Sequence, residues 1–216
     1  MELKEEQKKV SLFRISFQRV SNLGISRILM LIAVIISILS ILLSFTSPEL
    51  AAWYQYTVDT PAIPMLNYYL TGLGTYICKG TTLCTNDIAF IGLIGGILVL
   101  VGSAVSLVAI IRNSKIFTII GGIIIFLGPL LLIIEILTGI DYFNELLSKF
   151  SLLQSDARVN SFYGSNRNLS NILRTDFSWG LGNGFYIAIV GGTLGLISSI
   201  STIILKIKMK GKVINF

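Results

Sequence analysis

The sequence predicts an all-α integral membrane protein, a bundle of four transmembrane helices with a small sheet or hairpin in its outer loops. Hydrophobic residues make up 53% of the 216 residues and charged residues only 13%, whereas about a quarter of a soluble domain is charged. Four long apolar runs account for this composition, and lysine and arginine are divided unevenly among the segments between the runs. Together these observations indicate a membrane protein.

Each apolar run is long enough to cross a bilayer as a helix. The runs, of 18, 24, 22 and 21 residues, are 28–45, 88–111, 116–137 and 185–205. A helix needs about 20 residues to cross a hydrocarbon core roughly 30 Å thick. Lipid leaves only helices and closed barrels as spanning structures, and barrel strands alternate rather than run apolar throughout. We therefore expect four spanning helices.

The positive charges predict an orientation. Twelve lysines and arginines lie in 1–27, 112–115 and 206–216, against five in 46–87 and 138–184. Because such residues are retained in the cytoplasm, we expect a plasma-membrane protein with both termini and the 112–115 turn inside and the two long loops outside. The net charge of +6 is thereby explained without nucleic acid, whose binding would favour basic residues interleaved with aromatics on one face.

Two helices are predicted outside the runs. Apolar residues recur at helical spacing in the lead 1–27, at Val10, Phe13, Phe17 and Val20, and in 140–154, at Phe143, Leu146, Leu147, Phe150 and Leu153. The basic lead is typical of a helix in the headgroup layer, and a docking helix for a partner is the alternative. The outer helix is expected to pack on the bundle or on the first loop.

Small residues predict close packing between the spanning helices. In the second and fourth runs, glycines stand four residues apart, at Gly92 and Gly96 and at Gly191 and Gly195. This spacing lets helix backbones approach closely in lipid. Packing within the bundle and lateral contact with another protein both remain open.

The third run carries two irregular features. Gly128 and Pro129 predict a kink, because proline lacks an N–H and its ring clashes with the preceding turn. Glu135 is the only charged residue within a run, and an intramembrane carboxylate is a functional candidate by default. Glu135 lies near the outer end, with Asp141 six residues on, so we expect an interfacial, partly hydrated carboxylate. A proton or cation pathway would need more such groups.

Both cysteines of the chain, Cys78 and Cys84, fall in the first outer loop. Thiols oxidise outside the cell, and closing seven residues would remove about 2.4 kcal/mol of unfolded-state entropy in the loop model. Zinc needs four ligands and the chain has no histidine, while a redox pair is more often Cys-x-x-Cys. We predict a structural disulfide that pins a small hairpin or sheet, since strand formers flank it.

The outer loops contain further candidate features. Asn168 begins a glycosylation sequon, Asn-Leu-Ser, on the expected outer side. The surrounding segment 161–185 is rich in Asn, Ser and Gly, which predicts turns for most of its length. Trp53 and Trp179 are interpreted as belt residues at the outer membrane interface, with ligand stacking as the alternative.

Several of these features together resemble the claudin and peripheral-myelin-protein superfamily. That superfamily has four spans, inside termini, and a first outer loop with a Trp, a Gly-Leu-Trp and two disulfide-paired cysteines on a small β-sheet. The matching positions are Trp53, Gly72, Leu73, Cys78 and Cys84. Gly74 stands where the motif has its second Trp, and only five residues separate the cysteines. The resemblance implies a protein that associates side by side in the membrane and presents its outer sheet to neighbours.

The residue types argue against catalysis. The chain lacks histidine, a phosphate-binding glycine loop and a Gly-x-Ser-x-Gly turn, so we expect no enzyme, no cofactor and no metal. The predicted role is contact in the bilayer with itself or with other membrane proteins. The alternative is an accessory subunit of a larger respiratory, transport or secretion complex. A channel or carrier ranks third, because few polar groups lie inside the runs.

Overall fold

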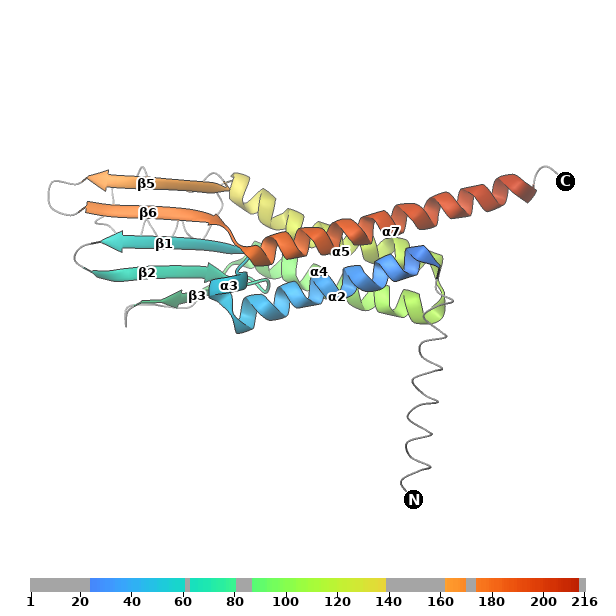
Figure 1. Ribbon diagram of the computed structural model, residues 1–216, viewed down its shortest axis with the longest axis horizontal. Coiled ribbons are helices and arrows are strands. Elements are labelled where there is room, and N and C mark those ends of the chain that lie inside the picture. The colour runs from blue at the N-terminus through green and yellow to red at the C-terminus, as the bar shows by residue number, and fades with distance from the viewer. Residues whose placement is uncertain (1–23, 61–62, 81–86, 139–161, 170–173, 214–216) are drawn as a thin grey trace, which may run out of the picture.

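The protein consists of a four-helix bundle with an antiparallel sheet extending from one of its ends (Figure 1). The computed structural model describes residues 24–60, 63–80, 87–138, 162–169 and 174–213. The predicted class, a mostly helical chain with four helices able to span a membrane and a small sheet, is confirmed. The expected helices in 1–27 and 140–154 lie outside the described residues or almost entirely so.

The bundle is built from α2 (Ile25–Thr46), α4 (Phe90–Arg112), α5 (Lys115–Thr138) and α7 (Asn183–Val213). Each contains an apolar stretch of 21 to 23 residues, long enough to cross a membrane. Large apolar side chains such as Ile35, Leu42 and Ile134 are half exposed on the outside of the bundle, as suits contact with lipid. The helix α7 continues as far as Val213, past the ends of the other three (Figure 1).

Helices α4 and α5 form a hairpin with a very short connection. Asn113 closes α4 in the left-handed conformation, with φ of 57°, and its N–H bonds to the Ala109 carbonyl. Asparagine is one of the few residues with a side chain that adopts this conformation readily at a helix end. The next helix begins two residues later, so α4 and α5 run antiparallel side by side.

The helices pack through serines that lie over glycines. The side chains of Ser37, Ser106 and Ser199 occupy the positions that a Cβ would need at Gly191, Gly121 and Gly122 respectively. These three contacts join α2 to α7, α4 to α5 and α7 to α5. Because lipid is as apolar as leucine, helices in a membrane associate through close packing and hydrogen bonds rather than through hydrophobic burial.

Hydrogen bonds between hydroxyl groups reinforce the contact of α2 with α7. The Ser26 hydroxyl lies 2.5 Å from the Thr202 hydroxyl and donates to the Ser198 carbonyl at 2.9 Å. The Ser198 hydroxyl donates in return to the Ser26 carbonyl at 2.5 Å. On the other side of α7, Ser199 donates to the Thr118 carbonyl of α5 at 3.2 Å. Interhelical bonds of this kind contribute about 0.6 kcal/mol each on average.

In the described residues the sheet has six strands in the order β4-β3-β2-β1-β6-β5, all antiparallel. The first four, from the loop between α2 and α4, are β1 (Tyr54–Thr60), β2 (Ile63–Leu70), β3 (Thr75–Lys79) and β4 (Asp87–Ile88). The other two, from the loop between α5 and α7, are β5 (Tyr163–Leu169) and β6 (Arg174–Leu181). A short helix, α3 (Pro48–Ala51), links α2 to β1.

The hairpin of β5 and β6 corrects the expectation that 161–185 consists largely of turns. Strand β6 pairs with β1 over most of its length, from Tyr54 opposite Leu181 to Asp59 opposite Asp176. The polar composition of this segment gives a weak strand signal by itself. Its strand conformation comes from pairing with a strand more than 100 residues earlier in the sequence, since context outweighs intrinsic β-propensity.

The two faces of the sheet differ in burial, as the period of two in a strand requires. One face is an aromatic core whose members Tyr54, Tyr56, Tyr68 and Tyr76 are at most 2% exposed. Trp179 lies on this face and stacks on Tyr56, with ring centroids 6.5 Å apart. The opposite face, which we call the open face, is exposed or half buried. Its described side chains include Gln55, Thr57, Asp59, Met65, Asn67, Tyr69, Ile77, Lys79, Asp176 and Ser178.

The serine and glycine packing makes a testable prediction at Gly191. A leucine there must displace Ser37, whose backbone nitrogen would lie 3.1 Å from the new Cβ, so Gly191→Leu is expected to cost about 1–3 kcal/mol of unfolding free energy. The neighbouring Val190 is 51% exposed, and Val190→Leu should change stability by less than about 0.5 kcal/mol. Thermal unfolding in detergent micelles compares the two. Equal stabilities would contradict this packing.

Candidate functional site

The joint between the sheet and the bundle is centred on Trp53, which is 1% exposed. Its indole Nε1 donates to the Ser40 hydroxyl of α2 at 2.9 Å, and Ser40 donates to the Gly184 carbonyl in the first turn of α7 at 2.7 Å. The Trp53 N–H bonds to Leu70 of β2, and its carbonyl accepts from Gly182. The expectation of an interfacial belt residue is wrong for Trp53, because its ring is enclosed by protein.

Gly72 packs closely against the Trp53 ring. A Cβ at Gly72 would stand 2.8 Å from the indole nitrogen, so any side chain there would push the ring aside. The Gly72 N–H donates to the Ser44 hydroxyl at 2.8 Å, one turn of α2 after Ser40. Leu73 is half buried against the same core. Three of the five positions matched to the claudin-like motif, Trp53, Gly72 and Leu73, therefore meet at the joint.

The turn that contains Gly72 and Gly74 packs directly on α4. Gly74 has a φ of +71°, which favours glycine, and its carbonyl accepts from Ala89 just before α4. A Cβ at Gly92 would lie 3.2 Å from the Gly74 Cα, and one at Gly96 would overlap the Gly72 carbonyl. We expected Gly92 and Gly96 to line a contact between helices. In the structure they pack against the turn between β2 and β3 instead, because the face of α4 that carries them meets this turn.

Other glycines make the contacts between helices. On α4, Gly95 faces the Gly128 carbonyl of α5. On α7, Gly191 faces Ser37 and Ala33 of α2, and a Cβ added at Gly195 would lie 3.4 Å from the Gly122 Cα of α5. Pro129 lies inside α5, which continues through it to Thr138. The kink expected there stays a prediction.

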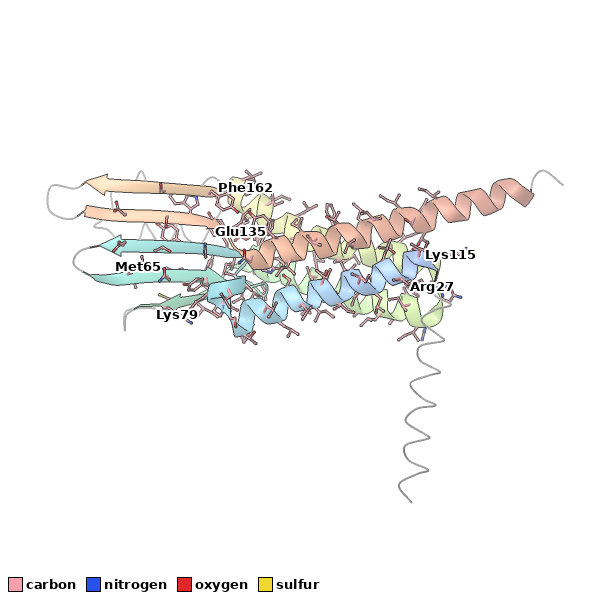
Figure 2. All side chains as sticks on the ribbon, viewed as in Figure 1. Arg27, Met65, Lys79, Lys115, Glu135 and Phe162 are labelled. Atoms are coloured by element: carbon pink, nitrogen blue, oxygen red, sulfur yellow. The ribbon has the colours of Figure 1, made fainter. Side chains whose placement is uncertain are left out.

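Glu135 lies where the bundle meets the sheet (Figure 2). Its side chain is 3% exposed, so the expectation of a partly hydrated carboxylate is wrong. One turn earlier on α5, Leu132 belongs to the same buried cluster as Trp53, which explains why this part of α5 is enclosed. Asp141, its expected companion, lies outside the described residues.

Two predicted covalent features stay predictions. Cys78 lies in β3 opposite Tyr68, half buried against the aromatic core. Cys84 falls outside the described residues, so the pairing of the two cysteines is to be shown by mass spectrometry of unreduced peptides. Asn168 lies in β5 opposite Thr175, and its glycosylation is equally untested.

An exposed ion pair links the sheet to α3. Lys79 of β3 pairs with Glu49 of α3 at 2.6 Å, with side chains 48% and 57% exposed; exposed pairs contribute about 0–1 kcal/mol. Burial raises the pKa of Tyr69, with Glu49 adding to the rise and Lys79 opposing it. In the part of the chain described, no three His, Cys, Asp or Glu side chains gather as a metal site would require.

Comparison with protein-family models and with curated proteins finds no match for this chain. The interpretation of the site therefore depends on its geometry. Sequence reasoning missed Ser40 and Ser44, which fasten the sheet to α2. A signal was present, since α2 has small or polar residues at Ala33, Ser37, Ser40 and Ser44, spaced three or four apart on one face.

The aromatic core predicts a specific loss of stability at alkaline pH. Burial raises the pKa of Tyr68 above its usual value of 10.0, so the phenol loses its proton first in the unfolded chain. The stability that it contributes is complete below pH 10 and is lost as the pH rises toward the folded pKa. Between pH 8 and 11, the free energy of unfolding should therefore fall more in the wild type than in Tyr68→Phe. Tyr163→Phe, at a ring 56% exposed, is the control, and an identical pH profile for all three proteins would contradict the prediction.

Proposed function

We propose that this chain is a non-enzymatic, four-span plasma-membrane protein that acts through contacts with other membrane proteins, beside it in the bilayer and at its outer sheet. The observation that carries the proposal is the joint. A six-stranded sheet drawn from both loops is fastened to the bundle by buried hydrogen bonds and glycine contacts. Such a sheet moves with the bundle, as a surface for recognition requires.

The open face supports this role by its composition. Most of its described side chains are short or uncharged, although Asp59, Lys79 and Asp176 are charged. Thr57 donates to Asn67 across the strands at 3.0 Å. Gln55, Asp59 and Met65 are exposed. A pre-formed face of this kind loses little conformational entropy on contact with a partner.

The charge distribution and the family resemblance support the orientation. With both termini in the cytoplasm, as the positive charges predict, the sheet faces the outside of the cell. The resemblance to claudins rests on Trp53, Gly72, Leu73, Cys78 and Cys84, of which the first three meet at the joint. In this proposal the motif serves to fix the sheet to the membrane-spanning part.

The test is recovery of partners from the source membrane in gentle detergent, with two differently tagged copies of the chain. We expect the copies to be recovered together. Introducing positive charge on the open face, in Gln55→Arg or Met65→Arg, should lower that recovery about tenfold, or ~1.4 kcal/mol of contact free energy. Ile111→Arg is the control, because this residue is 82% exposed and lies at the far end of α4.

Two results would contradict the proposal in different ways. Recovery unaffected by the open-face substitutions would exclude that face from the contact. Recovery of a fixed set of other proteins without a second copy would make the chain an accessory subunit of their complex, and any catalytic activity would then belong to those proteins.

A further inference from the structure

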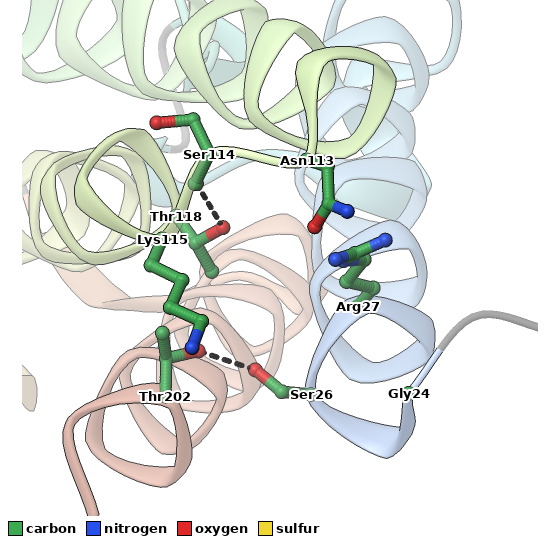
Figure 3. Close-up of a pocket in the computed structure, with 8 residues that line it drawn as sticks. All are labelled: Gly24, Ser26, Arg27, Asn113, Ser114, Lys115, Thr118 and Thr202. Atoms are coloured by element: carbon green, nitrogen blue, oxygen red, sulfur yellow. Dashed lines mark hydrogen bonds between the residues drawn. The ribbon is translucent and has the colours of Figure 1, made fainter. Parts of the chain in front are cut away.

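At the end of the bundle away from the sheet, the ends of three helices enclose a hollow of about 220 Å³ (Figure 3). The residues that line it are Gly24, Ser26, Arg27, Asn113, Ser114, Lys115, Thr118 and Thr202. They come from the start of α2, the turn between α4 and α5, the first turn of α5, and α7. Pockets for drug-sized ligands measure about 300–1,000 Å³, so this hollow suits a smaller group.

Two cationic side chains enter the hollow from different helices. Arg27 belongs to the first turn of α2, and Lys115 is the first residue of α5. In Figure 3, Lys115 extends toward Thr202 and Ser26, while the Arg27 guanidinium lies beside Asn113. Neither forms an ion pair with a carboxylate of a described residue. The hollow thus holds two positive charges that its described walls leave unneutralised.

The rest of the lining is polar and held in place. The hydroxyls of Ser26 and Thr202 are 2.5 Å apart, and Thr118 donates to the Ser114 carbonyl at 2.9 Å. Ser26, Thr118 and Thr202 are each less than 10% exposed. Both α2 and α5 begin at the hollow, and Gly24, the N-cap of α2, supplies no side-chain cap. Helix starts carry unpaired N–H groups and partial positive charge, which adds to the attraction for an anion.

The position of the hollow narrows the class of ligand. The apolar stretches of α2 and α5 begin at Ile25 and Lys115, so the hollow lies at the level of the lipid headgroups. Guanidinium and ammonium groups bind phosphate oxygens through charge-assisted hydrogen bonds, and basic pockets between membrane helices bind anionic headgroups. We propose that this hollow binds a phosphate group, carried by an anionic phospholipid or by a small phosphate compound.

The experiment uses the full chain, delipidated in detergent, and native mass spectrometry with three probes: phosphatidylglycerol, phosphatidylcholine and inorganic phosphate. The wild type is expected to retain phosphatidylglycerol and to lose most of it in Arg27→Gln/Lys115→Gln. Hydrogen bonds to charged groups predict about a tenfold or larger loss of affinity for each residue. The charge-preserving Lys115→Arg should keep the ligand, which separates loss of binding from loss of folding.

The matched control is Arg112→Gln, which removes a charge at the same end of the bundle from a residue outside the hollow. It should retain phosphatidylglycerol as the wild type does. Binding of inorganic phosphate that depends on Arg27 and Lys115 in the same way would support the site and assign it to a soluble phosphate compound. Equal retention by the wild type and the double variant would overturn the proposal. So would an equal loss in Arg112→Gln, which would mean attraction by the general positive charge.

Discussion

The hydrogen bond from the Trp53 indole to Ser40 is the interaction on which the arrangement of this protein depends. It joins the segment just before the first strand to the last turns of α2, and through Ser40 it also reaches Gly184 at the start of α7. A buried indole N–H needs an acceptor, since a buried donor without a hydrogen bond costs about 1–3 kcal/mol. Because α2 supplies that acceptor, the sheet is held to two helices at once.

Glycine and serine allow close packing between elements throughout the molecule. At the joint, Gly72, Gly74 and Gly96 let the loop between α2 and α4 lie on α4 and on the Trp53 ring without a side chain between them. Inside the bundle, serine hydroxyls fill the space above glycines of the next helix. One buried cluster therefore runs from Val99 and Leu132 in the helices to Tyr56 and Tyr76 in the sheet. The sheet and the bundle share a core.

The sequence predicts those parts of the fold that local patterns determine. Four apolar runs of about 20 residues are unambiguous, because the bilayer sets the length of a spanning helix. The hairpin of β5 and β6 escapes prediction, because its polar residues become strands only by pairing with β1. Trp53 is misread for a related reason. A tryptophan just after a span is typical of the membrane interface, and only the folded chain brings Ser40 and Gly72 to its ring.

A double-mutant cycle between Trp53 and Ser40 measures whether their hydrogen bond holds the sheet to the bundle. Trp53→Phe removes the N–H and keeps an aromatic ring, Ser40→Ala removes the acceptor, and unfolding of each variant and of the pair is followed in detergent micelles. We expect a coupling of about 1 kcal/mol or more between the two substitutions, since each breaks the same buried bond. Effects that add within about 0.3–0.5 kcal/mol would show that the sheet is held to the bundle by other contacts.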